Sequence, residues 1–314
     1  MAKTNYARTF GQDLMRGEHR VGGGMSKKKA VSLPEGAQDG GGGLLIDGYR
    51  RQSKGQMANS SINAVFGSAE DSGSDQSTTG TSIFDPVLCE LAYTWFSPPD
   101  GAILDPFAGG SVRGIVAAYL GRKYTGVDLR AEQIAANVVQ GAAIVPDNQP
   151  TWIVGDSATD LPAGQFDFVF SCPPYADLEV YSDNPQDIST MDYPDFIAVY
   201  RSIVAQSVDR LHDDRFACFV VGDVRDKKGI YRNFVSDTIA AFQDAGAMLY
   251  NEAILVTAVG SLPIRVGKQF DSGRKLGKTH QNVLVFIKGD GKRATQACGP
   301  VQVIDPAEMF GEVS

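Results

Sequence analysis

Hydrophobic residues are distributed unevenly along the chain. Residues 1–80 are rich in Gly, Ser, Asn and Gln, contain GGG and GGGG runs, and show no sustained period of apolar positions. We expect this N-terminal segment to be flexible. From Ile83 onward, short apolar runs of β type alternate with helical patterns, and past Gly289 the chain turns polar again. The pattern predicts one folded domain over residues 81–290 and a loosely ordered C-terminal tail over 291–314.

Predicted strands and helices alternate within the folded region. A helix is expected to begin at Asp85-Pro86 and run to Phe96, because Asp suits the N-cap and Pro suits the first turn. Such alternation is typical of a mainly parallel sheet covered on both faces, so the predicted fold class is α/β with a doubly wound, seven-stranded sheet. The strands are expected over 102–104, 124–127, 152–154, 166–170, 216–221, 249–257 and 282–287, and further helices over 112–119, 131–139, 193–211 and 234–245.

Composition limits the class of protein. The chain has 314 residues, of which 43% are hydrophobic and 21% charged, as in ordinary globular proteins. No apolar run approaches the roughly 18 to 20 residues that span a bilayer, and the start MAKTNYARTF lacks the apolar stretch of a signal peptide. The four cysteines are scattered, without the paired spacing of zinc sites or disulfide frameworks. We therefore expect a cytoplasmic protein with reduced thiols, no bound metal and no membrane partner.

Charge is also distributed unevenly. The net charge of −8 argues mildly against a nucleic-acid partner, since phosphate binding relies on clustered Lys and Arg. Two stretches are nevertheless basic, namely the first 54 residues and residues 258–280. The second stretch predicts either a phosphate-binding surface or a solvated loop, and both readings stay open. Its basic residues are Arg265, Lys268, Arg274, Lys275 and Lys278.

The first predicted strand ends in a glycine-rich turn, DPFAGGS, over residues 105–111. Such a turn lets the backbone approach a ligand at the carboxyl edge of a sheet. No Gly-Lys-Ser/Thr follows, which excludes a P-loop. The second strand ends at Asp128, whose carboxylate can accept both hydroxyls of a ribose, and the third is followed by Asp156. Three acidic strand ends suit a positively charged sulfonium nucleoside and would repel a phosphate.

DPFAGGS resembles the AdoMet-binding motif, usually DPFAGSG, of the DNA amino-methyltransferases, with Gly110 and Ser111 exchanged. The resemblance implies a Rossmann-like class I AdoMet-dependent methyltransferase fold and S-adenosyl-L-methionine as cofactor. It implies that Asp105 lies near the amino acid moiety, that Asp128 binds the ribose and that Asp156 faces the adenine. Residues 82–86 look like the segment that contacts the methionine part. The cofactor-binding residues expected from it are Asp105, Phe107, Ala108, Gly109, Gly110, Ser111, Asp128, Leu129, Asp156 and Ser157.

The fourth predicted strand runs directly into a turn with two prolines. Two prolines cannot continue a central strand, so the chain leaves the sheet in a stiff, extended turn with free carbonyls. Fixed acceptors beside an aromatic ring suit an extruded base that stacks on Tyr175 and donates hydrogen bonds from its amino group. The turn resembles the D/N/S-P-P-Y/F motif of the same family. The expected catalytic residues are Ser171, Cys172, Pro173, Pro174 and Tyr175.

Cys172 departs from the pattern, because the family has Asp, Asn or Ser immediately before the prolines. A thiol is a weak acceptor, so either the carbonyl of Pro173 carries more of the interaction or Ser171 reaches the amino group. Attack of a thiolate on cytosine C5 is disfavoured, since the nucleophilic Cys of those enzymes follows a proline and Cys172 precedes both. The departure leaves adenine and cytosine open as targets.

The resemblance as a whole implies a site-specific DNA methyltransferase of the type found in restriction-modification systems and bacteriophages. The expected reaction is methyl transfer to adenine N6 or cytosine N4 of a base flipped out of double-stranded DNA, in a bacterial or phage-infected cell. Sequence specificity would come from the basic loop, residues 176–192 or the N-terminal segment. The alternatives are an RNA or protein amide methyltransferase of the same fold, and a catalytically inactive, methyltransferase-like module that binds nucleic acid.

Overall fold

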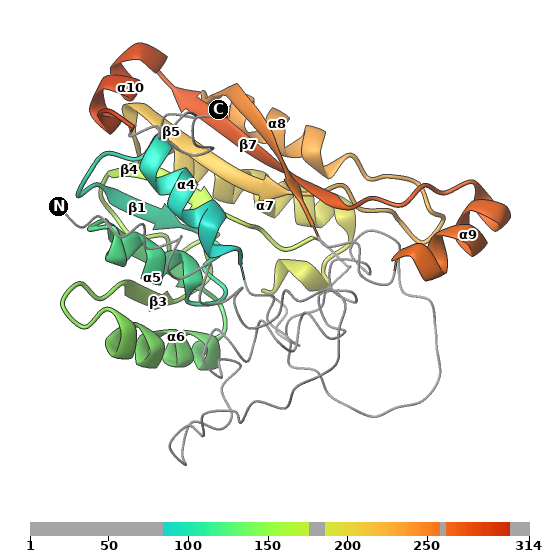
Figure 1. Ribbon diagram of the computed structural model, residues 1–314, viewed down its shortest axis with the longest axis horizontal. Helices are drawn as coiled ribbons and strands as arrows, with labels where there is room; N and C mark the ends of the chain where they lie inside the picture. The colour runs from blue at the N-terminus through green and yellow to red at the C-terminus, as the bar shows by residue number, and fades with distance from the viewer. Residues whose placement is uncertain (1–83, 176–185, 258–261, 302–314) are drawn as a thin grey trace, which may run out of the picture.

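The computed structural model describes residues 84–175, 186–257 and 262–301 (Figure 1). The predicted N-terminal segment 1–80 lies outside the described residues, as do residues 176–185 of the segment 176–192 that was expected to contribute to sequence specificity. Seven strands form one sheet in the order β3-β2-β1-β4-β5-β7-β6. In chain order these are β1 Ala102–Asp105, β2 Lys123–Asp128, β3 Thr151–Val154, β4 Phe166–Ser171, β5 Leu211–Val221, β6 Met248–Val256 and β7 His280–Lys288.

The first five strands are parallel, and β7 is inserted antiparallel between β5 and β6. The chain starts in the middle of the sheet at β1, builds outward through β2 and β3, and then returns to add β4 on the other side of β1. The carboxyl ends of β1 and β4 therefore flank the point where the strand order reverses, which is where open α/β sheets bind ligands. The expected seven-stranded, Rossmann-like class I methyltransferase fold is confirmed.

Helices cover both faces of the sheet (Figure 1). One layer contains α4 Pro86–Phe96, α5 Val112–Tyr119, α6 Ala131–Ile144 and α10 Gly291–Cys298, and the other contains α7 Tyr193–Asp209 and α8 Phe234–Asp244. A short 3-10 helix, η3 Ile188–Thr190, precedes α7. The helix α9 Leu262–Gly273 belongs to neither layer and stands at the far end of an arm formed by β6 and β7. No helix in the described ranges is long and apolar enough to cross a bilayer.

The central strands show why the sheet has two cores. Side chains alternate between faces with a period of two, so Phe168 and Phe170 of β4 pack toward α4 while Val169 packs toward α7. Phe168 and Phe170 both meet Tyr93 of α4 edge to face, with ring centroids 6.1 and 5.3 Å away. Burial on both faces explains the continuous apolar runs from which these strands were predicted.

The helix α4 begins and ends where the sequence predicts. The side chain of Asp85 accepts hydrogen bonds from the backbone N–H groups of Val87 at 2.8 Å and Leu88 at 3.2 Å, and Pro86 occupies the first turn. This cap satisfies two N–H groups that have no partner within the helix. Phe84, in the segment predicted to contact the methionine part, lies under the guanidinium of Arg113 and against Phe170.

The prediction of a loosely ordered tail from residue 291 onward was wrong for its first part, which forms α10. Asp290 caps this helix by accepting a hydrogen bond from the backbone N–H of Arg293 at 2.9 Å. Ala294 and Cys298 lie four residues apart and are buried against α4 and the sheet. Two apolar positions are too few to produce a visible helical period, so only the packing reveals the helix. Residues 302–314 lie outside the described range.

Two further elements differ from expectation. The strand β5 begins at Leu211, five residues before the predicted start, and in this added part Leu211 pairs with Phe166 of β4 and Arg215 pairs with Lys288 of β7. The basic stretch 258–280, which was expected to be a loop, contains the helix α9.

Candidate functional site

Three acidic residues reach the carboxyl edge of the sheet on neighbouring strands. Asp105 is the last residue of β1, Asp128 is the last of β2, and Asp156 follows the end of β3 by two residues. Because β1, β2 and β3 are adjacent and parallel, their ends lie side by side. The structure thus brings together the three strand ends that the sequence singled out.

The carboxylate of Asp105 lies beneath the β1 turn and has no exposed surface. Its Oδ2 accepts hydrogen bonds from Arg113 Nε at 2.6 Å and Tyr124 Oη at 2.7 Å. Its Oδ1 accepts hydrogen bonds from Ser171 Oγ at 2.6 Å and the backbone N–H of Phe107 at 3.1 Å. The carboxylate accepts hydrogen bonds from four protein donors, and these bonds fix the conformation of the turn after β1. Its expected place beside the amino acid moiety stays a prediction, and any contact there would come from the turn that it holds.

Arg113, in the first turn of α5, is one of two residues of this site that the sequence analysis did not identify. Its Nη2 donates to the carbonyl oxygens of Phe107 at 2.6 Å and Ala108 at 2.9 Å, which fixes the backbone of the glycine-rich turn. Burial by itself lowers the pKa of the guanidinium, but the Asp105 carboxylate outweighs burial and the net pKa is raised, so the guanidinium of Arg113 stays charged. An arginine within an otherwise apolar helix was the available signal.

Gly109 and Asp128 connect the β1 turn to the end of β2. Gly109 has a φ of 50°, a conformation that favours glycine, and its N–H donates to Asp128 Oδ2 at 2.9 Å. The N–H of Arg130 donates to Asp128 Oδ1 at 2.9 Å, and Asn137 Nδ2 of α6 donates to the Gly109 carbonyl at 2.7 Å. Burial raises the pKa of Asp128, and these two backbone N–H donors oppose the rise. The side chain of Asp128 is still 16% exposed, so it remains open to a ligand.

The remaining residues of the expected cofactor site line the same edge. The N–H of Ala108 donates to the Val127 carbonyl at 2.9 Å, and the hydroxyl of Ser157 donates to the Pro106 carbonyl at 2.5 Å. These two bonds tie the β1 turn to the ends of β2 and β3. Ser111 begins α5 and contacts the side chain of Gln140, while three partly exposed residues complete the edge: Gly110, Leu129 and Asp156.

Ser171, one of the two candidates for contact with a target amino group, is the last residue of β4 and is fully buried. Its hydroxyl donates to Asp105, as described above, and so belongs to the network beneath the turns. In this structure the hydroxyl is not available to a substrate. Cys172, the next residue, is partly exposed. Of the two residues, Cys172 is therefore the one that solvent reaches, and it is also the residue that differs from the D/N/S-P-P-Y/F pattern.

Tyr175 lies against β5 and β7 at the end of the proline turn. Its hydroxyl accepts a hydrogen bond from Gln281 Nε2 of β7, and its ring packs edge to face on Phe234 of α8, with centroids 6.1 Å apart. Gly222, which directly follows β5, lies beside the ring, since a Cβ added there would be 3.7 Å from it, an ordinary van der Waals distance. Tyr175 is only 8% exposed, so a base could stack on its ring only if neighbouring residues moved.

Gln281 is a second residue that sequence reasoning missed. It lies 106 residues after Tyr175, and the two side chains meet only because β7 folds back beside β5. No local pattern predicts such a contact. Of the other turn residues, Pro173 is buried and Pro174 is partly exposed. Asp223, which follows Gly222, accepts a hydrogen bond from the backbone N–H of Val235 at 3.2 Å and so holds the start of α8.

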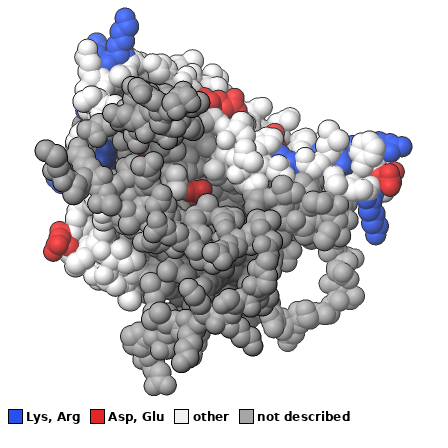
Figure 2. All heavy atoms as spheres, in the orientation of Figure 1, with Lys and Arg blue, Asp and Glu red and all other residues white. Residues whose placement is uncertain are grey.

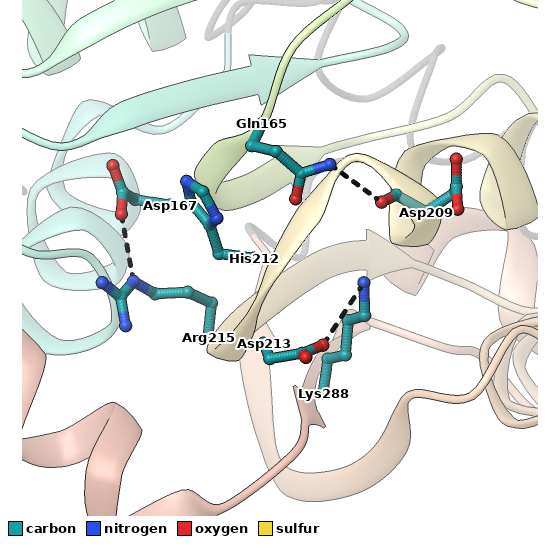
Figure 3. A pocket seen from close by; sticks show the side chains of 7 residues that line it. All are labelled: Gln165, Asp167, Asp209, His212, Asp213, Arg215 and Lys288. Atoms are coloured by element: carbon teal, nitrogen blue, oxygen red, sulfur yellow. Dashed lines mark hydrogen bonds and ion pairs between the residues drawn. The ribbon is translucent and has the colours of Figure 1, made fainter.

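A separate hollow of about 560 Å³ lies at the opposite edge of the sheet, where β4 and β5 begin (Figure 3). Its charged groups already pair with protein atoms: Arg215 Nε with Asp167 Oδ1 at 3.0 Å, and Lys288 Nζ with the Leu211 carbonyl at 2.6 Å. This edge carries none of the residues expected to bind or react. The seven lining residues are Gln165, Asp167, Asp209, His212, Asp213, Arg215 and Lys288.

The similarities of this chain to known proteins are to solved structures. No protein-family model and no curated protein sequence matches the chain. Among solved structures it is similar to a methyltransferase from Pyrococcus furiosus (15% identity, TM-score 0.45, covering 77% of this chain and 99% of that one) and to the magnesium protoporphyrin IX methyltransferase ChlM from Synechocystis with bound SAM (11%, 0.43, 79% and 99%). The chain is also similar to TrmN from Thermus thermophilus (13% identity, TM-score 0.43). This match covers 65% of this chain but only 49% of TrmN, so the chain spans about half the length of that protein.

Proposed function

We propose that this chain is an AdoMet-dependent methyltransferase that methylates an exocyclic amino group of a base in DNA, at adenine N6 or cytosine N4. The observation that carries the proposal is the hydrogen bond of 2.6 Å from Ser171 Oγ to Asp105 Oδ1. This hydrogen bond joins the turn after β1, whose sequence resembles an AdoMet-binding motif, to the turn after β4, which contains Pro173, Pro174 and Tyr175. A methyl donor held at the first turn and a base held at the second would lie next to each other.

The residues at the β1 and β2 ends fit the proposed cofactor. The carboxylate of Asp128 is oriented by two backbone N–H donors and keeps lone pairs for ribose hydroxyls. The open conformation of Gly109 leaves room for close approach of a ligand, since a Cβ there would meet no atom closer than 4.0 Å. Asp156 accepts a hydrogen bond from the Ala158 N–H at 2.8 Å, which fixes a second carboxylate near the proposed adenine position.

The protein would contribute position and electrostatics to the reaction. When bound, AdoMet supplies a methyl group on a positively charged sulfur. The amine nitrogen forms the new C–N bond, the C–S bond breaks with its electron pair passing to sulfur, and the amine releases one proton to solvent. Carbonyls at the proline turn would accept hydrogen bonds from the amino group, and a fixed arrangement of this kind lowers the barrier without a covalent enzyme intermediate.

Calorimetry with AdoMet tests the cofactor half of the proposal. We expect the full chain to bind AdoMet, and we expect D128N to bind it much more weakly because an amide cannot replace both carboxylate oxygens. The matched control is D147N, at an exposed acid after α6 with no role in the site. Absence of AdoMet binding by the unaltered chain would favour a catalytically inactive module and overturn the proposal.

Methyl transfer to several acceptors tests the other half. Duplex DNA, RNA and protein are incubated with the chain and AdoMet, and the nucleosides from the nucleic acids are separated by mass spectrometry. We expect N6-methyladenine or N4-methylcytosine from DNA. Methylation of RNA alone, or of protein alone, would replace DNA with that acceptor while keeping the cofactor. Formation of 5-methylcytosine would contradict amino-group chemistry.

A further inference from the structure

Two loops of the chain carry clustered basic residues and meet near the proposed base site. The first is the connection between β5 and α8, over residues 222–233. The second is the connection between β6 and β7, which contains α9 and forms the end of the arm. The net charge of the chain is −8, so a concentration of cations in one place is unusual for it. Figure 2 shows Lys and Arg side chains gathered around the outer end of the arm.

The first loop is a tight hairpin with two lysines at its tip. The Gly229 N–H donates to the Asp226 carbonyl at 2.8 Å, which closes a turn around Lys227 and Lys228, and both lysines are exposed. The carboxylate of Asp226 accepts the N–H of Ile230 at 2.8 Å and so stabilises the turn.

The base of this hairpin is also fixed. The guanidinium of Arg225 lies 3.7 Å from the ring centroid of Tyr231, and its Nη1 donates to the Gly229 carbonyl at 2.9 Å. Arg225 and Tyr231 also form a β-bridge. The two tip lysines are therefore presented by a hairpin whose own conformation is well determined.

The second loop contributes cations from the C-terminal half of α9 and the residues after it. Lys268 and Arg274 are exposed, and Arg274 is oriented by packing over the ring of Phe270 at 4.9 Å. Lys275 extends toward the hairpin, where its end contacts Gly229. This contact places the two loops side by side. Asp271 is the one acid between Lys268 and Lys278.

Both loops join the sheet next to Tyr175. The hairpin follows Gly222, which lies beside the Tyr175 ring, and the arm returns to the sheet at Gln281, which bonds the Tyr175 hydroxyl. From these contacts we infer that Lys227, Lys228, Lys268, Arg274 and Lys275 form a basic rim that binds the phosphodiester backbone of the nucleic acid whose base is methylated. This inference rests on the proposed function, because it concerns the acceptor of the same site.

Salt-dependent binding tests the basic rim. A short fluorescein-labelled DNA duplex and an RNA of the same sequence are titrated with the full chain over a range of salt concentrations, and anisotropy gives the dissociation constant. The slope of log Kd against log salt reports the number of phosphates contacted, and each lost lysine contact should lower it by about 1. We expect K227Q/K228Q to lower the slope by about 2, and K268Q/R274Q to lower it similarly.

The matched control is K123Q/K292Q, which removes two exposed lysines at the opposite edge of the sheet. We expect it to retain the original slope. Equal slopes for the rim variants and the control would overturn the rim, and so would absence of nucleic-acid binding by the unaltered chain. AdoMet calorimetry on the same samples separates the two proposals: if AdoMet binds and the rim variants behave as the control does, the rim fails while the cofactor site stands. The DNA and RNA arms show which backbone is preferred.

Discussion

The turns after β1 and β4 lie next to each other, but they are held in different ways. The β1 turn rests on a buried ion pair between Asp105 and Arg113, and Arg113 also binds two of its carbonyls. The β4 turn beyond Ser171 is held by the packing of the Tyr175 ring on Phe234 and by the hydrogen bond from Gln281 to the Tyr175 hydroxyl. Under the proposed function, the β1 turn with its buried ion pair would be the preorganised cofactor site, and the β4 turn, held without an ion pair of that kind, would be the site that a base enters and leaves. Substitutions should therefore affect mainly stability in the first turn and mainly activity in the second.

The largest expected effect is on stability, from replacing Arg113. In R113M the Asp105 carboxylate stays buried without its cation, which should lower the free energy of unfolding by about 3–5 kcal/mol. Urea denaturation followed by circular dichroism measures the change. The control is R130M, since Arg130 lies 3.9 Å from Asp128 near the surface, where an ion pair contributes about 0–1 kcal/mol. A similar small loss in both variants would show that the β1 turn does not depend on the buried pair.

The second effect is on activity, from removing the aromatic face of Tyr175. Stacking of a base on an aromatic ring contributes about 1–3 kcal/mol, so Y175L should reduce kcat/KM for methyl transfer roughly 5- to 150-fold. Y175F keeps the aromatic face and loses only the hydroxyl that accepts the hydrogen bond from Gln281, so it should retain much more activity than Y175L. Calorimetry should show unchanged AdoMet binding in both variants, and thermal denaturation shows how much packing each one loses. Equal activity of Y175L and Y175F would exclude a stacking role.

The same contrast explains what could be predicted from the sequence. The central strands and most helices were predictable because each buries a continuous apolar run or one apolar face, and the start of α4 was predictable because Asp85-Pro86 is a local capping signal. The three acidic strand ends followed from the strands themselves. Arg113, Gln281 and the β5–α8 hairpin act across elements, so their roles depend on which strands become neighbours. The helix α10 was missed because only Ala294 and Cys298 face the core.

A smaller effect is expected from the hydrogen bond between Gln281 and Tyr175. Q281L removes the hydrogen bond from Gln281 to the Tyr175 hydroxyl, which should cost about 1–2 kcal/mol and leave the Tyr175 ring less firmly positioned. A double-mutant cycle with Y175F isolates the interaction: Q281L should reduce kcat in the original background and have little further effect in Y175F. Additive losses in the cycle would assign Gln281 a role independent of Tyr175.

The smallest effect is expected at Cys172, where the chain departs from the family pattern. Serine is similar in size and a better acceptor than a thiol, so C172S should leave stability nearly unchanged and raise kcat by up to about fivefold, the equivalent of one weak hydrogen bond. C218S is the matched control, because Cys218 is fully buried in β5 and a hydroxyl there should destabilise the fold without improving catalysis. A loss of activity in C172S with AdoMet binding intact would mean that the thiol itself is required, which would contradict an acceptor role shared with the turn carbonyls and would make Cys172 the distinctive chemical group of this site.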